Sequence, residues 1–154
     1  MVSTNYKQKI AIVYSSITGN TAELAGMLVE CVKEQGMKVD VYSPQDFCRE
    51  KVDAFDAVLV GTYTWGSGEI PREMLGVYRH FEKAGNKHVV TAVFGTGDSF
   101  FAEFCGAVDR FRDMLYVHTT LAATLKVELM PQERDLARCE KFAAAVAGRL
   151  INEK

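Results

Sequence analysis

Ile10-Ala11-Ile12-Val13-Tyr14-Ser15-Ser16-Ile17-Thr18-Gly19-Asn20-Thr21 joins an apolar, β-branched run to a turn rich in hydroxyl groups. The turn contains no lysine or arginine, and apolar residues at helical spacing begin directly after it. A strand, such a turn and a helix together bring backbone N–H groups, hydroxyl groups and the positive end of the helix to one point. The turn from Ser15 to Thr21 therefore predicts a site for a phosphate monoester that uses no charged side chain.

The same turn excludes two common nucleotide sites. A P-loop hydrolase needs G-x-x-x-x-G-K-[ST] to reach the outer phosphates, and a dinucleotide fold uses G-x-G-x-x-G at its first turn. Neither pattern occurs at this turn. A hydroxyl-rich turn before a helix is most often only a helix cap, so the function depends on what the other loops add.

Short β-branched runs alternate with helical segments along the whole chain, which predicts an α/β fold with a doubly wound parallel sheet and helices on both faces. The expected strands are Ile10 to Tyr14, Val39 to Tyr42, Ala57 to Gly61, Val89 to Phe94 and a less regular fifth between Leu121 and Leu129. The first and third runs are solidly apolar, as central strands are, whereas the second alternates like an edge strand. Gly36 is expected to end the first helix, and Pro71 and Pro131 to open the second and last.

The composition is that of one domain spanning residues 1–154, with 48% hydrophobic residues and a formal net charge of -2. Neither a basic stripe for nucleic acid nor an apolar run long enough for a membrane is visible, and the first residues lack the apolar core of a signal peptide. Cysteines 31, 48, 105 and 139 form no C-x-x-C motif and no Cys/His cluster. We therefore expect free, packed thiols in the cytoplasm and no metal site.

Two further loops are expected at the carboxyl edge of the sheet, where ligands of such folds bind. The loop Thr62 to Ile70 carries the only tryptophan, Trp65, near glycines, and the loop Gly95 to Phe101 adds more aromatic rings. Aromatic rings can stack on both faces of a flat ligand, while peptide groups at glycines reach its heteroatoms. The sequence thus predicts a planar ligand with one terminal phosphate.

Three segments resemble the three FMN-binding loops of the flavodoxins: residues 16–21 (SITGNT), 64–66 (TWG) and 97–109 (GDSFFAEFCGAVD). The resemblance covers nearly the whole chain in the right order, and it is to the short-chain branch because no long insertion interrupts the last strand region. It implies a flavodoxin-like sheet of five strands in the order 2-1-3-4-5, with non-covalently bound FMN that transfers one electron at a time.

The resemblance also implies roles for residues of the loops. Ser16, Thr18, Asn20 and Thr21 would hold the phosphate. Trp65 would cover one ring face and Phe101 the other, with Phe100 as a competing candidate for the outer face. Asp98 and Cys105 would offer backbone N–H groups to the pyrimidine edge. The full set of expected cofactor-binding residues is Ser15, Ser16, Ile17, Thr18, Gly19, Asn20, Thr21, Thr62, Tyr63, Thr64, Trp65, Gly66, Ser67, Gly68, Gly95, Thr96, Gly97, Asp98, Phe100, Phe101, Glu103, Phe104 and Cys105.

The function that follows is a low-potential one-electron carrier, not an enzyme, with no catalytic residue of its own. Its transient partners would be a reductase of the flavodoxin/ferredoxin-NADP type as donor and redox enzymes as acceptors, and we expect a monomer. An FMN-dependent quinone or azo reductase remains an alternative, as does a flavin-bearing activator of one partner enzyme. Glu69, Glu73, Asp98 and Glu103 form either a solvated rim or a partner-facing patch.

Overall fold

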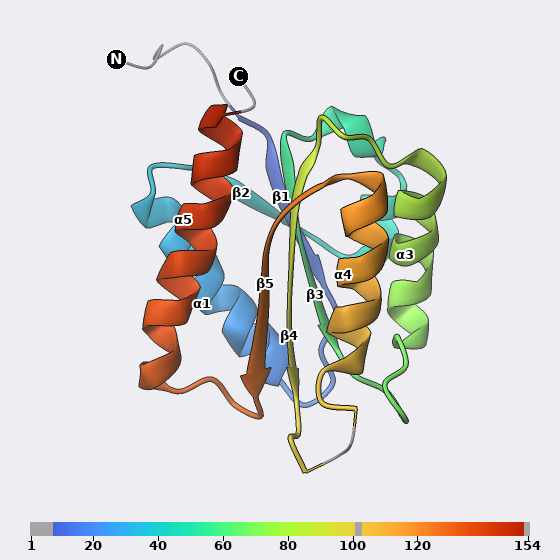
Figure 1. The fold of residues 1–154 in the computed structure, drawn as a ribbon, viewed down its shortest axis with the longest axis vertical. Coiled ribbons are helices and arrows are strands. Elements are labelled where there is room, and N and C mark those ends of the chain that lie inside the picture. The colour runs from blue at the N-terminus through green and yellow to red at the C-terminus, as the bar shows by residue number, and fades with distance from the viewer. Residues whose placement is uncertain (1–7, 101–102, 153–154) are drawn as a thin grey trace.

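The chain forms one parallel sheet of five strands in the order β2-β1-β3-β4-β5, with helices on both faces (Figure 1). This computed structural model describes residues 8–100 and 103–152. The strands are β1 (Ile10–Tyr14), β2 (Val39–Tyr42), β3 (Ala57–Tyr63), β4 (Val90–Gly97) and β5 (Thr120–Glu128). The helices are α1 (Asn20–Glu34), α2 (Pro44–Cys48), α3 (Arg72–Ala84), α4 (Gly106–His118) and α5 (Leu136–Asn152), with short 3-10 turns η1 (Val52–Ala54) and η2 (Glu133–Asp135). The predicted fold class and strand order are confirmed.

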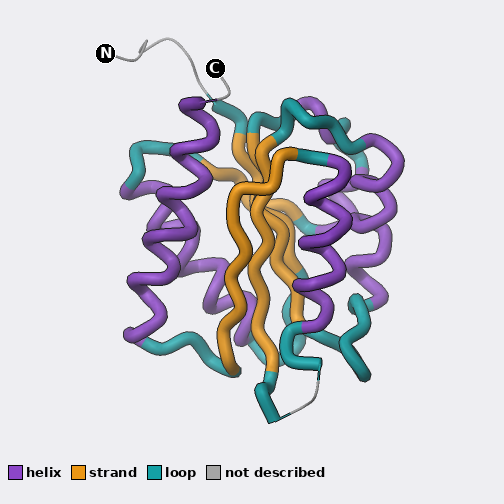
Figure 2. Tube along the Cα trace, viewed as in Figure 1, coloured by secondary structure: helices purple, strands orange, loops and turns teal. Residues whose placement is uncertain are grey.

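Each face of the sheet has its own hydrophobic core, because neighbouring side chains on a strand point to opposite faces. Ile10 and Ile12 of β1 belong to the core shared with α1 and α5, whereas Ala11 and Val13 belong to the core shared with α2, α3 and α4. Figure 2 shows the strands between these two helix layers. As predicted, the apolar β1 and β3 are internal and the alternating β2 lies at an edge.

Two strands extend further than the sequence indicates. β3 continues through residues 62–63 and β4 through residues 95–97, so these expected loop residues belong to the sheet. The ladder continues because Thr62 pairs with Gly95 and Tyr63 with Thr96. Gly95 is not a turn residue: a Cβ there would lie 2.3 Å from both Thr62 O and a Val108 side-chain carbon. Glycine is required at position 95 because β3 and α4 approach the backbone there closely, and the spacing of residues in the sequence does not reveal this contact.

Two of the three predicted helix boundaries are correct. Gly36, with a φ of 82°, follows the end of α1, and Pro71 directly precedes α3. The prediction for Pro131 is wrong, because residues 132–135 first form the turn η2 with a reciprocal capping box, and α5 begins only at Leu136. Within residues 8–100 and 103–152, no helix combines the length and the apolar character needed to cross a membrane.

Candidate functional site

The connections that leave β1, β3 and β4 meet at one end of the sheet, the lower end in Figure 1. β1 and β3 are neighbours although α1 and β2 lie between them in the sequence, so the strand order reverses at this point. Open α/β sheets bind their ligands at such a reversal. We call residues 15–19 the first loop, residues 64–70 the second loop and residues 98–105 the third loop; Phe101 and Ala102 of the third loop lie outside the described residues.

The first loop presents unpaired polar groups at the start of α1. Ser15 is 8% exposed, and its Oγ is the one buried side-chain oxygen or nitrogen without a partner in the described part of the chain. Ser16 Oγ accepts a hydrogen bond of 3.2 Å from the backbone N–H of Ala22. The first-turn N–H groups of Asn20 and Thr21 have no acceptor within their own helix. Gly19, with a φ of 93°, turns the chain into α1 and leaves open space where a Cβ would be. These groups fit an anion.

Thr21 is a first-loop neighbour whose side chain points inward. It is 1% exposed, and its Oγ1 lies 2.7 Å from Oγ1 of the buried Thr96 on β4, in a hydrogen bond that either hydroxyl can donate. The Thr21 hydroxyl therefore links α1 to β4, and only its backbone N–H is available to a ligand. Ile17 is 63% exposed and Thr18 is exposed as well, so the middle of the loop faces outward.

The second loop is a short hairpin closed by its own backbone. Trp65 N–H donates to Glu69 O at 2.8 Å, and Glu69 N–H donates to Trp65 O at 2.7 Å. Gly66 and Gly68 at the tip have φ of 53° and 87°, which favours glycine over other residues. The Trp65 side chain is 58% exposed. The ring lies outside the core, and its stacking on a ligand stays a prediction.

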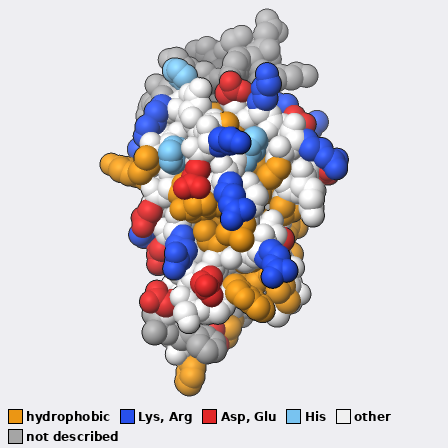
Figure 3. Space-filling model, turned by 90° about the vertical axis from the view of Figure 1, so that its right-hand side faces the viewer, with side chains coloured by type: hydrophobic (Ala, Val, Ile, Leu, Met, Phe, Trp, Pro, Cys, Tyr) orange, Lys and Arg blue, Asp and Glu red, His pale blue; other side chains and the backbone are white. Residues whose placement is uncertain are grey.

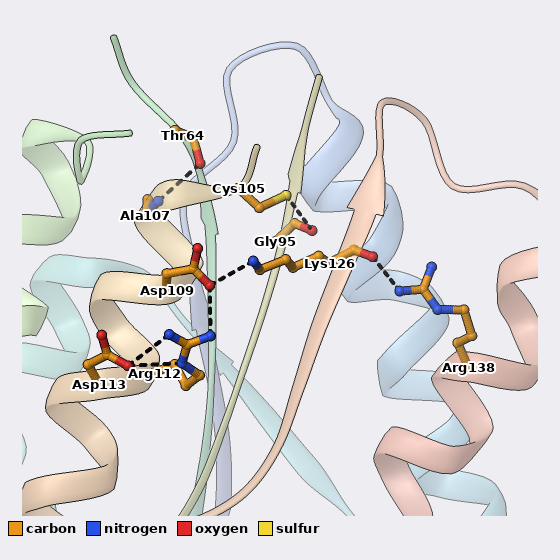
Figure 4. A network of polar contacts seen from close by, with 9 residues as sticks. All are labelled: Thr64, Gly95, Cys105, Ala107, Asp109, Arg112, Asp113, Lys126 and Arg138. Atoms are coloured by element: carbon orange, nitrogen blue, oxygen red, sulfur yellow. Dashed lines mark hydrogen bonds and ion pairs between the residues drawn. The ribbon is translucent and has the colours of Figure 1, made fainter. Parts of the chain in front are cut away.

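Helix α4 anchors the second loop. The backbone N–H of Ala107 donates to Thr64 Oγ1 at 3.2 Å, a contact drawn in Figure 4. A Cβ on Gly106 would lie 2.6 Å from Gly68 Cα, so the two backbones touch. Arg110 Nε donates to Gly68 O at 2.8 Å. The sequence interpretation did not single out Arg110 as a residue of the site. Its position in the sequence offered one clue: Arg110 follows Gly106 by four residues, and residues four apart lie on the same face of a helix.

The third loop combines an exposed ring with a buried thiol. Phe100 is 88% exposed, and its backbone N–H donates to Asp98 Oδ1 at 2.9 Å. Cys105 adopts a left-handed conformation with a φ of 53° immediately before α4, and its Sγ lies 3.9 Å from Gly95 O (Figure 4). Burial raises the pKa of the Cys105 thiol to about 12, so the thiol is neutral. The choice between Phe100 and Phe101 as the outer ring stays a prediction.

The carboxylates near the loops differ in their exposure and in their hydrogen bonds to the protein. Glu73 accepts a 2.6 Å hydrogen bond from the Tyr63 hydroxyl, and burial together with this carboxylate raises the pKa of the Tyr63 phenol. Glu69 and Glu103 are exposed, and Asp98 is half-buried. The sequence left open whether these acids form a solvated rim or a patch that faces a partner. In the structure, Glu73 accepts a hydrogen bond from within the protein.

The first and second loops border a common hollow. Its volume is about 480 Å³, and its lining residues are Ile17, Tyr63, Trp65, Glu69, Ile70, Arg72, Glu73 and Leu75. The α3–α4 side of the molecule in Figure 3 shows hydrophobic and charged side chains together toward this lower end. The site thus has exposed apolar groups beside acidic and basic ones, a surface that suits contact with a protein partner.

Comparison with known proteins gives consistent matches over most of the chain. Residues 12–142 match the model of the Flavodoxin family. Probable flavodoxin 1 of Bacillus subtilis (strain 168) is 33% identical over 138 residues, covering 88% of this chain and 87% of that protein. The flavodoxin of Nitratidesulfovibrio vulgaris is 32% identical over 145 residues, covering 92% of this chain and 96% of that protein.

A solved structure agrees with the observed fold. The crystal structure of oxidised flavodoxin 2 from Bacillus cereus superposes with a TM-score of 0.84 at 33% sequence identity, covering 92% of this chain and 99% of that one. The agreement extends over nearly the full length of both chains.

Proposed function

The chain belongs to the flavodoxin family and carries electrons on non-covalently bound FMN, and we propose that its three loops hold this FMN for low-potential transfer from a reductase to acceptor enzymes. The observation that carries the proposal is the buried, unpartnered Ser15 Oγ beside the free end of α1. A buried hydroxyl without a partner costs free energy, and a phosphate oxygen would supply the missing partner.

We assign the phosphate to the first loop. The hydroxyl groups of Ser15, Ser16 and Thr18 and the first N–H groups of α1 form a neutral donor set, and the positive end of the helix adds attraction. Thr21 would contribute its backbone N–H while its hydroxyl holds Thr96. A neutral cradle favours the single terminal phosphate of FMN over the pyrophosphate of FAD.

We assign the flavin ring to the second and third loops. Trp65 would cover one face and Phe101 or Phe100 the other, while backbone groups at Gly66, Asp98 and Cys105 would meet the polar edge. Each aromatic stack contributes on the order of 1 kcal/mol or more. The bonds to Thr64 and Gly68 support this assignment, because a loop held in place loses less conformational freedom when a ligand binds.

When bound, FMN supplies the chemistry of accepting and releasing single electrons. The charged side chains near the loops would influence the reduction potential of the bound FMN. Glu69, Asp98 and Glu103 oppose additional negative charge near the loops, which favours release of an electron and hence a low potential. Arg110 acts in the opposite direction, and its exposure to solvent weakens the effect.

For partners we propose a donor of the flavodoxin/ferredoxin-NADP reductase type and several acceptor enzymes, each bound transiently. All three loops come from one chain, which supports a monomeric carrier. The free thiols Cys31, Cys105 and Cys139 are buried, which supports a reducing compartment such as the cytoplasm.

The test is reconstitution of the apoprotein with FMN, FAD and riboflavin, followed by flavin fluorescence. We expect tight binding of FMN and at least about 100-fold weaker binding of riboflavin, because the phosphate contacts are lost. Equal affinity for riboflavin would refute the first-loop assignment. Steady-state oxidation of NAD(P)H with a quinone distinguishes a carrier, which turns over negligibly alone, from the alternative quinone reductase.

A further inference from the structure

The tip of the second loop depends on a single side chain for its hydrogen bonding to the body of the protein. The tip comprises residues 66–68, of which only Gly68 is buried. Within residues 8–100 and 103–152, the bond from Arg110 Nε to Gly68 O, 2.8 Å long, is the one side-chain hydrogen bond to this tip. Trp65 directly precedes the tip, and its backbone pairs with that of Glu69, which directly follows the tip.

Arg110 differs from the other arginine in the middle of α4. Arg112 is paired with the carboxylates of Asp109 and Asp113, at 2.9 Å each (Figure 4). Arg110 forms no ion pair within the described part of the chain, and the contact that it makes is to a backbone carbonyl. Its hydrogen bond is therefore made to a neutral peptide and not to a carboxylate.

The backbones beneath this bond are in contact. A Cβ on Gly106 would lie 2.6 Å from Gly68 Cα, and a Cβ on Gly68 would lie 2.9 Å from Glu103 Cβ. Gly68 can therefore neither sink further toward α4 nor carry a side chain. The Arg110 bond opposes movement of Gly68 away from the helix. The backbone contact and this bond together restrict the position of Gly68.

We propose that Arg110 is a positioning residue that holds the second loop, and with it Trp65, in the arrangement that receives the flavin ring. The inference rests on the assignment of the second loop to FMN. The Arg110 side chain acts through its hydrogen bond to Gly68 O, not through its charge. A loop fixed before binding loses less conformational freedom when the ligand arrives, so the bond increases affinity for FMN.

Two neutral substitutions separate the hydrogen bond from the charge. In Arg110→Gln the amide nitrogen stands as many bonds from Cα as Nε does in arginine, so it can donate to Gly68 O. Arg110→Met has a similar length and no donor. Arg112→Met removes a cation from the same helix without touching the loop, and it serves as the control.

The first readout is the motion of Trp65 in the apoprotein, followed by time-resolved fluorescence anisotropy, since this is the only tryptophan of the chain. We expect a larger fast component of depolarisation in Arg110→Met, and wild-type behaviour in Arg110→Gln and Arg112→Met. The second readout is FMN affinity, which we expect to fall about 5- to 10-fold in Arg110→Met, the scale of one lost hydrogen bond, and to stay near wild type in Arg110→Gln.

Unchanged Trp65 motion in Arg110→Met would overturn the inference, as would equal effects of the Gln and Met substitutions, which would assign the effect to charge. Increased Trp65 motion with unchanged FMN affinity would also overturn it, and Trp65→Ala then identifies the failing step. If Trp65→Ala weakens FMN binding, the second loop is correctly assigned and only the role of Arg110 fails. If Trp65→Ala has no effect, the loop assignment itself is wrong.

Discussion

Replacing Ser15 by alanine should stabilise the apoprotein and weaken FMN binding at the same time. The Ser15 hydroxyl is buried without a partner, and such a group costs about 1–3 kcal/mol of desolvation. Alanine removes the hydroxyl and leaves nearly the same volume. We expect the apoprotein to gain about 1 kcal/mol in free energy of unfolding, the lower end of that range.

The same substitution should weaken the binding of FMN. If the hydroxyl donates to the phosphate of FMN, its loss removes a hydrogen bond to a charged acceptor, and affinity falls about 10-fold, equivalent to about 1.4 kcal/mol. Urea unfolding of the apoprotein gives the first quantity, and quenching of flavin fluorescence on titration gives the second. Opposite signs in one variant are difficult to obtain from a general disturbance of the fold.

Thr21→Val is the matched control. Its hydroxyl is bonded to Thr96 inside the protein, so the substitution leaves the Thr96 hydroxyl unpaired and should destabilise the apoprotein by about 1–2 kcal/mol. Adding Thr96→Val should restore most of the loss, since neither hydroxyl then remains. A Ser15→Ala apoprotein less stable than wild type would refute the reasoning, because it would mean that the hydroxyl is already satisfied without FMN.

Three further predictions concern the loops. Trp65→Ala should lower FMN affinity by about 5- to 150-fold, equivalent to 1–3 kcal/mol for one aromatic stack, with an unchanged far-UV circular dichroism spectrum; an unaltered affinity would remove Trp65 from the site. Gly68→Ala should destabilise the apoprotein by about 1–2 kcal/mol, because φ is 87° and the new Cβ would lie 2.9 Å from Glu103 Cβ, whereas Gly26→Ala, with open space at its Cβ, should not, as urea unfolding will decide. Burial raises the pKa of Cys105 from 9.0 to about 12, so the neutral thiol is favoured in the folded state and its contribution to stability declines as the pH rises from about 9 toward 12. Cys105→Ala should make that decline less steep in urea unfolding at pH 8 to 10.5, and an identical slope would show that the thiol does not titrate in this way.

The sequence predicted the elements that have a periodic pattern. β1 from Ile10 to Val13 and β3 from Ala57 to Val60 are apolar at every position, and the central location of both strands follows from that pattern. The same reasoning located the three loops at one edge, because parallel strands share a carboxyl end. Gly36 was predictable as well, since glycine after an apolar helix is a frequent stop signal.

What the sequence did not indicate depends on contacts between distant segments. Gly95 looked like a turn residue, but it is a strand residue whose missing side chain admits Val108 and the Thr62 carbonyl. Thr21 looked like a phosphate ligand, yet its hydroxyl is bonded to Thr96, 75 residues away. Arg110 was not singled out from the sequence, yet it bonds the carbonyl of Gly68, 42 residues away. In each case the residue type was visible and its partner was not.

The bonds that escaped the sequence interpretation are also the ones that connect the loops. Thr21 joins the start of α1 to β4, the Ala107 N–H joins α4 to Thr64, and Arg110 joins α4 to Gly68. Each of these bonds joins two groups of the protein itself, and a backbone held by such bonds loses less conformational freedom when a ligand binds. The exposed side chains, such as Ile17, take no part in them. We therefore expect a substitution at such a residue to leave the geometry of the three loops unchanged, so that the proposed cofactor site and the proposed contact with redox partners can vary separately.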